Sequence, residues 1–214
     1  MANYILYNGE LYHHGVKGMK WGVRRYQNKD GSLILPKGSV VKRVSLSKQD
    51  LTYDNKKYVS INPEDHEKWE SYMGKGYARS NIATYVQTYQ TAKNLKVMSS
   101  IKQGEEYSKM LLNSDFKNTA IKDTLYANQF LNNQKPSDDM SINIARNIAA
   151  QTATGKAFVK RVLEQGYDAL EDTHGKNTAK DPLIVLNPDV NLNKIAEPEY
   201  TEPAKEVLRR YGLL

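Results

Sequence analysis

The sequence predicts an α+β fold with a mixed sheet and several helices, since strand-like segments come first, helix-like segments follow and strands return near the C-terminus. β-branched residues and turn signals mark the early strands, while capping residues and glycines bound the helices. The chain has 214 residues, of which 39% are hydrophobic. It is therefore long enough for one domain with a tail, and it can bury a core.

An extended basic segment over residues 1–32 precedes a domain that we expect over residues 33–214. Residues 1–48 hold nine Lys and Arg against two acidic residues, whereas the rest of the chain carries 22 of each sign. The segment shows no helical or strand period and is too short for a core of its own. A basic arm on a neutral body suggests an acidic partner, either nucleic acid or a protein surface, although a solvated tail that aids solubility is an equal alternative.

Aromatic and basic side chains lie together in this N-terminal segment. Exposed Trp and Tyr beside Arg are typical of binding hot spots, so the segment is predicted to be a docking peptide. The residues that we expect to contact its partner are His14, Lys17, Lys20, Trp21, Arg24 and Arg25.

The first half of the domain is predicted to be mainly strands. A turn at residues 36–38 leads into a strand that contains Val40, Val41 and Val44, and residues 56–62 form a second strand. Asn62 caps a helix that ends at Gly74 and Gly76. Residues 81–99 are rich in Thr, Tyr and Val and predict one or two further strands.

The second half is predicted to be mainly helices. Ser99 or Ser100 caps a helix to about Leu112, and three helices follow at 116–132, 139–152 and 155–165, the last of which ends at Gly166. Strands at 167–172 and 183–188 flank a polar loop, and a final helix is expected at 202–211.

Several classes of protein and site are excluded by composition. The chain has no cysteine, which rules out disulfides, thiolate metal sites and cysteine nucleophiles. No apolar run is long enough to span a bilayer, and the first residues do not have the pattern of a signal peptide. The histidines lack partners at ligand spacing, and no phosphate loop or serine elbow is present, so no metal is expected.

One set of residues is a candidate for chemistry. Arg43 lies in an early strand, Ser60 ends the next strand, and Glu171 and Asp172 end a late strand. A strand arginine can bind a phosphate with two hydrogen bonds, and a carboxylate can stabilise a sugar cation. Taken singly, Arg43 is more often a surface residue, and either acid is more often a turn carboxylate.

The stretch HHGVKGMKWGVRR resembles a short signature that recurs near an end of otherwise different proteins from phages and prophages of Gram-positive bacteria. Because it recurs on different bodies, the resemblance implies a portable tag that directs its cargo to a phage capsid or a host protein. It also implies a virion or bacterial host cytoplasm as the location. No membrane partner is expected, because no apolar run is long enough to span a bilayer.

The segments LPKGSVVKRVS, KKYVSINPEDHEKW, YVQTYQTAKNLKVMS and GYDALEDTHGKNTAKDPLIVLNP resemble ADP-ribosyltransferase-like domains of phage head-associated proteins and bacterial toxins. The resemblance implies NAD as co-substrate, bound by Arg43, Ser60 and Tyr58. It also implies that Glu171 or Asp172 assists glycosidic cleavage. The expected function is transfer of ADP-ribose to a host protein. The alternatives are a non-catalytic virion or host-interaction protein that keeps the fold, and a nucleic-acid binder that uses its basic arm.

Overall fold

The computed structural model describes residues 4–7, 10–13, 26–27, 32–45, 47–61, 83–113, 127–130, 132, 138–172 and 181–203. Within these ranges ten strands form one mixed sheet, and helices accompany it, so the mixed α/β character predicted from the sequence is confirmed. The strands of this sheet are β3 (Tyr26–Gln27), β4 (Leu33–Leu35), β5 (Val40–Ser45), β6 (Lys56–Ser60), β7 (Ala83–Thr91), β8 (Leu95–Met98), β9 (Ala169–Glu171), β10 (Pro182–Leu186), β11 (Leu192–Lys194) and β12 (Glu199–Pro203).

The strand order is β11-β7-β5-β6-β10-β9-β8-β4-β3, and β12 also pairs with β7. Among the described pairs β8 and β9 run parallel and the others antiparallel. β10 lies between β6 and β9, and all five of its residues are buried. This central strand therefore brings the end of β6 close to the end of β9, although the two are separated by more than 100 residues in the sequence.

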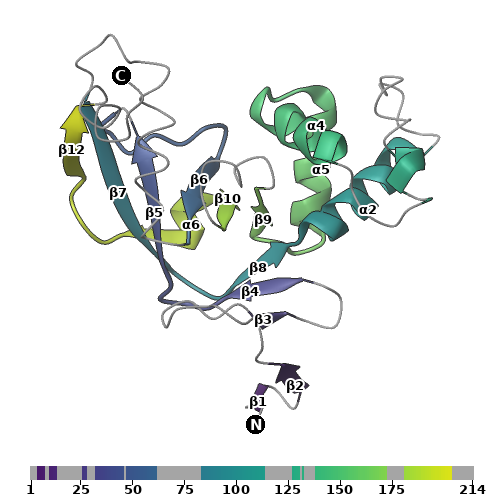
Figure 1. Cartoon of the computed structure of the whole chain (residues 1–214), viewed down its shortest axis with the longest axis horizontal. Helices are drawn as coiled ribbons and strands as arrows, with labels where there is room; N and C mark the ends of the chain where they lie inside the picture. Colours follow the sequence, from purple (N-terminus) through teal and green to yellow (C-terminus); the bar gives the residue numbers. More distant parts are fainter. Residues whose placement is uncertain are drawn as a thin grey trace, which may run out of the picture.

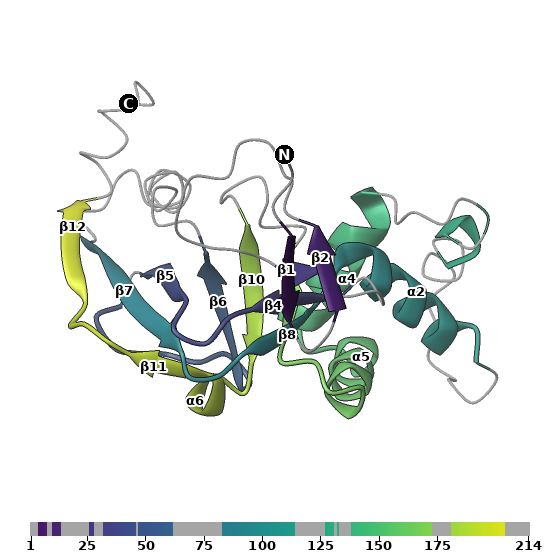
Figure 2. The same ribbon diagram turned by 90° about the horizontal axis from the view of Figure 1, so that it is seen from below.

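The longer helices gather on one side of the sheet, beside β8, β9 and β10 and away from β12 and β7 (Figure 1, Figure 2). They are α2 (Ser100–Leu111), α4 (Asp138–Ala149) and α5 (Ala153–Glu164), and a single turn, α6 (Pro188–Asn191), follows β10. No helix in the described ranges is long and apolar enough to cross a membrane.

Local sequence signals explain where two of these helices begin and where α5 ends. The Ser99 hydroxyl accepts a hydrogen bond from the Lys102 backbone N–H at 3.4 Å, and Thr152 accepts one from Gly155 at 3.0 Å. Gly166 follows α5 with φ of 75°, a left-handed conformation that glycine adopts without strain. The predicted cap at Ser99 and the predicted end at Gly166 are confirmed.

Two apolar cores lie on either side of the sheet. One packs the helices against strand residues that include Met98, Leu170 and Ile184. The other consists of strand residues, from Leu35 in β4 to Leu192 in β11, together with Ile61 directly after β6, so the sheet curves around it.

The structure differs from the sequence prediction at both ends of the chain. β1 (Tyr4–Tyr7) and β2 (Glu10–His13) form a hairpin, and β3 joins the main sheet through β4, so the N-terminal segment is not extended throughout. The helix predicted at 202–211 is wrong at its start, because residues 199–203 form β12 and pair with β7. The helix predicted from Asn62, most of the helix predicted at 116–132, and residues 204–214 lie outside the described residues.

Candidate functional site

The strand register aligns two of the predicted site residues in one row across the sheet. Ser60 in β6 is opposite Pro182 in β10, and the Asp172 N–H donates to the Pro182 carbonyl at 2.9 Å from the other side. Neighbouring strands are about 4.8 Å apart, so the Cα atoms of Ser60 and Asp172 are separated by roughly 10 Å. Both residues are buried. Side chains in one row point to the same face of a sheet, so Ser60 and Asp172 share a face.

Tyr58 lies on that same face, because it is two residues before Ser60 on the strand. Its ring packs against the core that contains the helices. Burial and, to a smaller extent, the negative charge of Asp172 raise the pKa of the Tyr58 phenol to about 12, and the positive charge of Arg43 opposes the shift. The phenol is therefore protonated at neutral pH and lies within electrostatic range of both Asp172 and Arg43.

Two buried hydroxyl groups at this place have no hydrogen-bond partner among the described residues: Tyr58 Oη and Ser60 Oγ. Leaving a buried polar group unsatisfied costs on the order of 1–3 kcal/mol, so most such groups in proteins find partners. Two of them on one strand, next to a carboxylate, provide hydrogen-bond donors for a polar ligand.

Glu171 has a different role from Asp172. Its Oε2 accepts a hydrogen bond from the backbone N–H of Ser100, the first residue of α2, at 2.8 Å. Its backbone carbonyl accepts a second bond, from Gln103 Nε2, also at 2.8 Å. A carboxylate at a helix N-terminus stabilises the helix, so Glu171 holds α2 against β9.

Arg43 begins on the opposite face of the sheet from Ser60. It follows Lys42, the residue opposite Ser60, and successive side chains on a strand alternate between faces. Its guanidinium lies 4.9 Å from the centroid of the Tyr53 ring, and its Nη1 donates to the Leu51 carbonyl at 3.4 Å. Arg43 thus has partners in the loop before β6, and its positive charge acts on the pKa of Tyr58.

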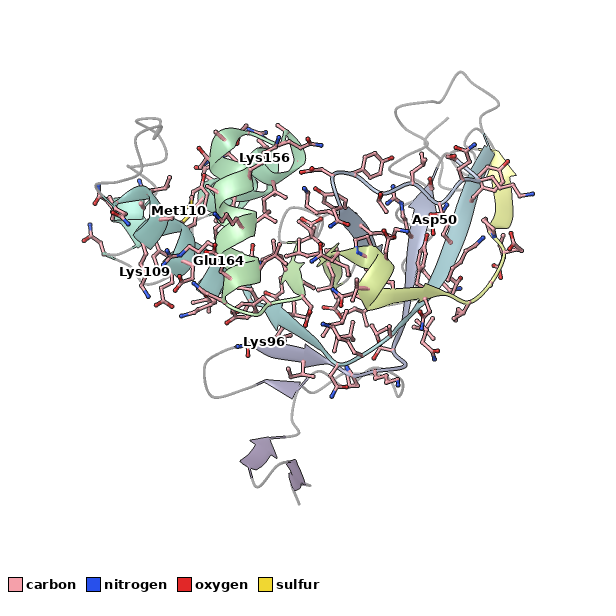
Figure 3. The ribbon with its side chains drawn as sticks, turned by 180° about the vertical axis from the view of Figure 1, so that it is seen from behind. Asp50, Lys96, Lys109, Met110, Lys156 and Glu164 are labelled. Atoms are coloured by element: carbon pink, nitrogen blue, oxygen red, sulfur yellow. The ribbon has the colours of Figure 1, made fainter. Side chains whose placement is uncertain are left out.

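A buried polar cluster fixes the loop over residues 47–55 that carries these partners. Asp50 forms an ion pair with Lys57, which is 3% exposed, and accepts a hydrogen bond from the Tyr89 hydroxyl at 2.6 Å. Gln87 Nε2 donates to a loop carbonyl at 2.9 Å. Burial alone would raise the pKa of Asp50, but the hydrogen bonds from Lys57 and Tyr89 outweigh it and hold that pKa below its usual value. Asp50 lies beside β5, far from α5 (Figure 3).

Sequence reasoning missed this cluster. Lys57 lies in a predicted strand, and the strand pattern alone does not show that its side chain is buried. A usable signal is the lysine pair directly before Tyr58 and Val59, because a lysine that faces a core needs a carboxylate partner.

The predicted docking residues of the N-terminal segment, His14, Lys17, Lys20, Trp21, Arg24 and Arg25, lie outside the described residues. In the part of the chain that is described, no group of three His, Asp or Glu side chains is placed to hold a metal ion.

Comparison with known protein families gives a match at the N-terminus. Residues 6–28 match a family of unknown function (DUF7211). The matched range includes the HHGVKGMKWGVRR stretch but none of residues 33–214. No curated protein and no solved structure matches the chain.

Proposed function

We propose that residues 33–214 form an ADP-ribosyltransferase-like domain of a phage-associated protein, which binds NAD where β6, β10 and β9 meet. The observation that carries this proposal is the pair of buried hydroxyls of Tyr58 and Ser60 beside Asp172, without partners among the described residues. These two hydroxyl groups can donate hydrogen bonds to a ligand with many acceptor oxygens, such as a dinucleotide.

Asp172 is the proposed carboxylate of the reaction, in preference to Glu171. The Glu171 carboxylate already bonds the first N–H of α2, whereas Asp172 shares a face with Ser60 and acts on the Tyr58 phenol through its charge. A group that stabilises a reacting centre must be near the groups that bind the substrate, and Asp172 meets this condition.

Arg43 is the proposed phosphate ligand. Its side chain leaves the strand on the face opposite Ser60, and the support for this role is that its charge acts on the Tyr58 phenol. One of its five N–H donors faces the Leu51 carbonyl and one face of the guanidinium faces Tyr53. Donors remain for a phosphate in a bidentate arrangement, and the tyrosine restricts the orientation of the guanidinium.

The proposed reaction breaks the bond between the nicotinamide nitrogen and C1′ of the ribose. Nicotinamide leaves as a neutral molecule with the bonding electrons, and C1′ develops the charge of an oxocarbenium ion, which Asp172 stabilises. A nucleophilic side chain of the host protein attacks C1′ and loses its proton, which gives the ADP-ribosylated product. The N-terminal segment, in this proposal, docks the domain on a capsid or host protein.

A non-catalytic virion or host-interaction protein is the second candidate. The contacts of Arg43 favour it, because a guanidinium that already has partners in Leu51 and Tyr53 can be a purely structural residue.

Calorimetric titration of NAD separates the two functions. We expect micromolar-to-millimolar binding by the unchanged protein, loss of binding in Arg43→Ala, and retained binding in Asp172→Asn. Nicotinamide release should fall by about 100-fold or more in Asp172→Asn, which is the usual contribution of a positioned carboxylate. Glu171→Gln is the matched control, and its nicotinamide release should stay within about twofold of the unchanged protein's, because its carboxylate serves α2. No binding by any of the four proteins would favour the non-catalytic candidate.

A further inference from the structure

A pocket lies at the end of β6 and β10 that is opposite to the Ser60 end. It has a volume of about 520 Å³ and is formed between α5 and the turn that leads into β6. Lys56 and Leu186 line it, whereas Ser60 and Pro182 are opposite each other four residues away along the same two strands. At about 3.3 Å per residue the two places are separated by roughly 13 Å. Pockets of 300–1,000 Å³ are typical of small-molecule sites.

The wall formed by the turn is rigid. Tyr53 and Lys56 exchange two backbone hydrogen bonds of 2.9 and 3.0 Å, and Asp54 and Asn55 between them have φ of 48° and 55°. Asn187, at φ of 46°, donates its backbone N–H to the Asn55 carbonyl at 3.0 Å, and the two asparagine side chains also bond each other. Asn and Asp adopt left-handed conformations at less cost than other residues with a Cβ.

The wall formed by α5 is also fixed. A Cβ added to Gly155 would be 2.0 Å from the carbonyl oxygen of Asn147, so α5 packs directly on the backbone of α4. Thr152 caps the same turn, with its hydroxyl 2.7 Å from Asn147 Oδ1. Both walls of the pocket are therefore preformed in the ligand-free protein, which reduces the entropic cost of binding.

The deep part of the pocket is apolar. Ile148 of α4 and Leu186 of β10 are almost fully buried, at 2% and 1% exposed. Val159 and Leu163 face them from α5, and Leu163 remains 37% exposed. An apolar group that covers Leu163 would gain about 25 cal/mol for each Å² removed from water.

The rim of the pocket is basic. Lys156 and Lys160 project from α5 one turn apart, and α5 has no acidic residue in its first turn to offset the positive end of its dipole. Lys160 Nζ lies 3.8 Å from Glu164 Oε1, with both side chains mostly exposed, so this ion pair contributes little. Lys156 and Glu164 lie toward opposite ends of α5 (Figure 3).

Asp54 is the acid on the facing wall, and it has its own partner. Lys56 Nζ lies 2.6 Å from its Oδ2 and 2.9 Å from its carbonyl oxygen. The pKa of Asp54 is below its usual value, mainly because of this hydrogen bond, and the charge of Lys156 across the pocket adds to the effect. Three lysines and two acids, Asp54 and Glu164, line the pocket, so the rim keeps a net positive charge.

We infer that this pocket binds a small amphipathic anion. The apolar body of the ligand packs on Ile148, Val159 and Leu163, and its carboxylate, sulfonate or phosphate group bonds Lys156 and Lys160. The inference does not depend on NAD binding at β6, because the two places share no residue that either argument uses.

Fluorescence titration with anilinonaphthalene sulfonate, an aromatic anion, tests it on the full chain. We expect saturable one-to-one binding that is weakened at least about tenfold, or 1.4 kcal/mol, in Lys156→Gln/Lys160→Gln. Lys37→Gln/Lys48→Gln is the matched control, since it removes the same charge from two exposed lysines outside the pocket and should leave the affinity unchanged. Uncharged phenylnaphthylamine should bind the unchanged protein at least about tenfold more weakly than the sulfonate does.

Three results would overturn the inference: no saturable binding of the sulfonate, an equal loss of affinity for it in both double variants, or equal affinity of the unchanged protein for the charged and uncharged probes. Leu163→Asn provides a second check that does not alter charge. This substitution should lower the affinity for both probes. Unchanged affinity for both would show that the apolar side chains of the pocket do not bind the ligand.

Discussion

The Glu171 carboxylate accepts a hydrogen bond from the Ser100 N–H at 2.8 Å, while the next residue, Asp172, faces the Tyr58 phenol side of the sheet. Adjacent residues on a strand point to opposite faces, so Glu171 is placed to hold α2, and Asp172 is the acid that the proposed function assigns to the ligand. The two acids of this strand end therefore have separable roles.

Glu171→Gln should lower the free energy of unfolding by about 1 kcal/mol, because the N-terminus of α2 loses a charged acceptor. Urea unfolding followed by circular dichroism measures this change. Asp172→Asn is the comparison, and it should leave the hydrogen bond at Ser100 intact. If both variants unfold at the same urea concentration as the unchanged protein, the assignment of Glu171 to α2 fails.

Tyr58→Phe should leave the stability of the ligand-free protein unchanged or raise it by up to about 1 kcal/mol, because it removes a buried hydroxyl without a described partner. NAD affinity should fall in the same variant. Thermal unfolding and calorimetric titration measure the two effects, which we expect to have opposite signs.

Tyr107→Phe is the matched control for this substitution. The Tyr107 hydroxyl is buried and accepts hydrogen bonds from Asn147 at 3.0 Å and Asn143 at 3.4 Å. Its removal leaves amide groups unsatisfied and should cost about 1–3 kcal/mol. A loss of stability in Tyr58→Phe as large as in Tyr107→Phe would show that the Tyr58 hydroxyl has a structural partner.

Features that depend on neighbouring residues could be predicted from the sequence, and these include the cap at Ser99, the helix end at Gly166 and the strands around Val41 and Tyr58. The hairpin of β1 and β2 was also predictable, because Asn8-Gly9 lies between them and this dipeptide is a strong hairpin signal. It was missed because aromatic and glycine residues obscured the alternation of the flanking strands.

Features that depend on strand register could not be predicted. Alternation alone requires Glu171 and Asp172 to face opposite sides, but which of them shares a face with Ser60 follows only from the pairing of β9 with β10. The burial of Lys57 similarly depends on a loop that returns Asp50 to the sheet, and no local pattern encodes that return.

Deletion of residues 1–30 should leave a domain that unfolds cooperatively. Among the residues whose burial the structure describes, both cores consist of residues from 33 onward, and the deletion removes β3, which has two paired residues in the sheet. A variant that lacks residues 1–25 retains β3. Its free energy of unfolding should exceed that of the variant lacking residues 1–30 by no more than about 2 kcal/mol. Differential scanning calorimetry compares the two, and loss of the melting transition in both would mean that the N-terminal segment belongs to the core.

Replacement of Glu106 should change how stability depends on pH. Burial raises the pKa of this carboxyl, but hydrogen bonds from Gln165, Arg161 and Lys109 outweigh it and lower the pKa from 4.5 to about 2. Because the folded value is lower than the unfolded one, Glu106 stabilises the fold fully above pH 4.5, and this stabilisation is lost as the pH falls toward 2. A shift of this size corresponds to at most about 3 kcal/mol.

Urea unfolding between pH 6 and pH 3, a range that spans the ordinary glutamate pKa of about 4.3, measures this contribution. The free energy of unfolding of Glu106→Gln should fall less steeply with decreasing pH than that of the unchanged protein, because the glutamine has no proton to bind. Glu164→Gln is the control, since that carboxyl is 63% exposed and 3.8 Å from Lys160, and its pH profile should follow that of the unchanged protein. Glu106 lies in α2 and accepts hydrogen bonds from Arg161 and Gln165 at the end of α5. If the Glu106→Gln profile falls as steeply as the other two, these bonds do not stabilise the fold through the charge of Glu106.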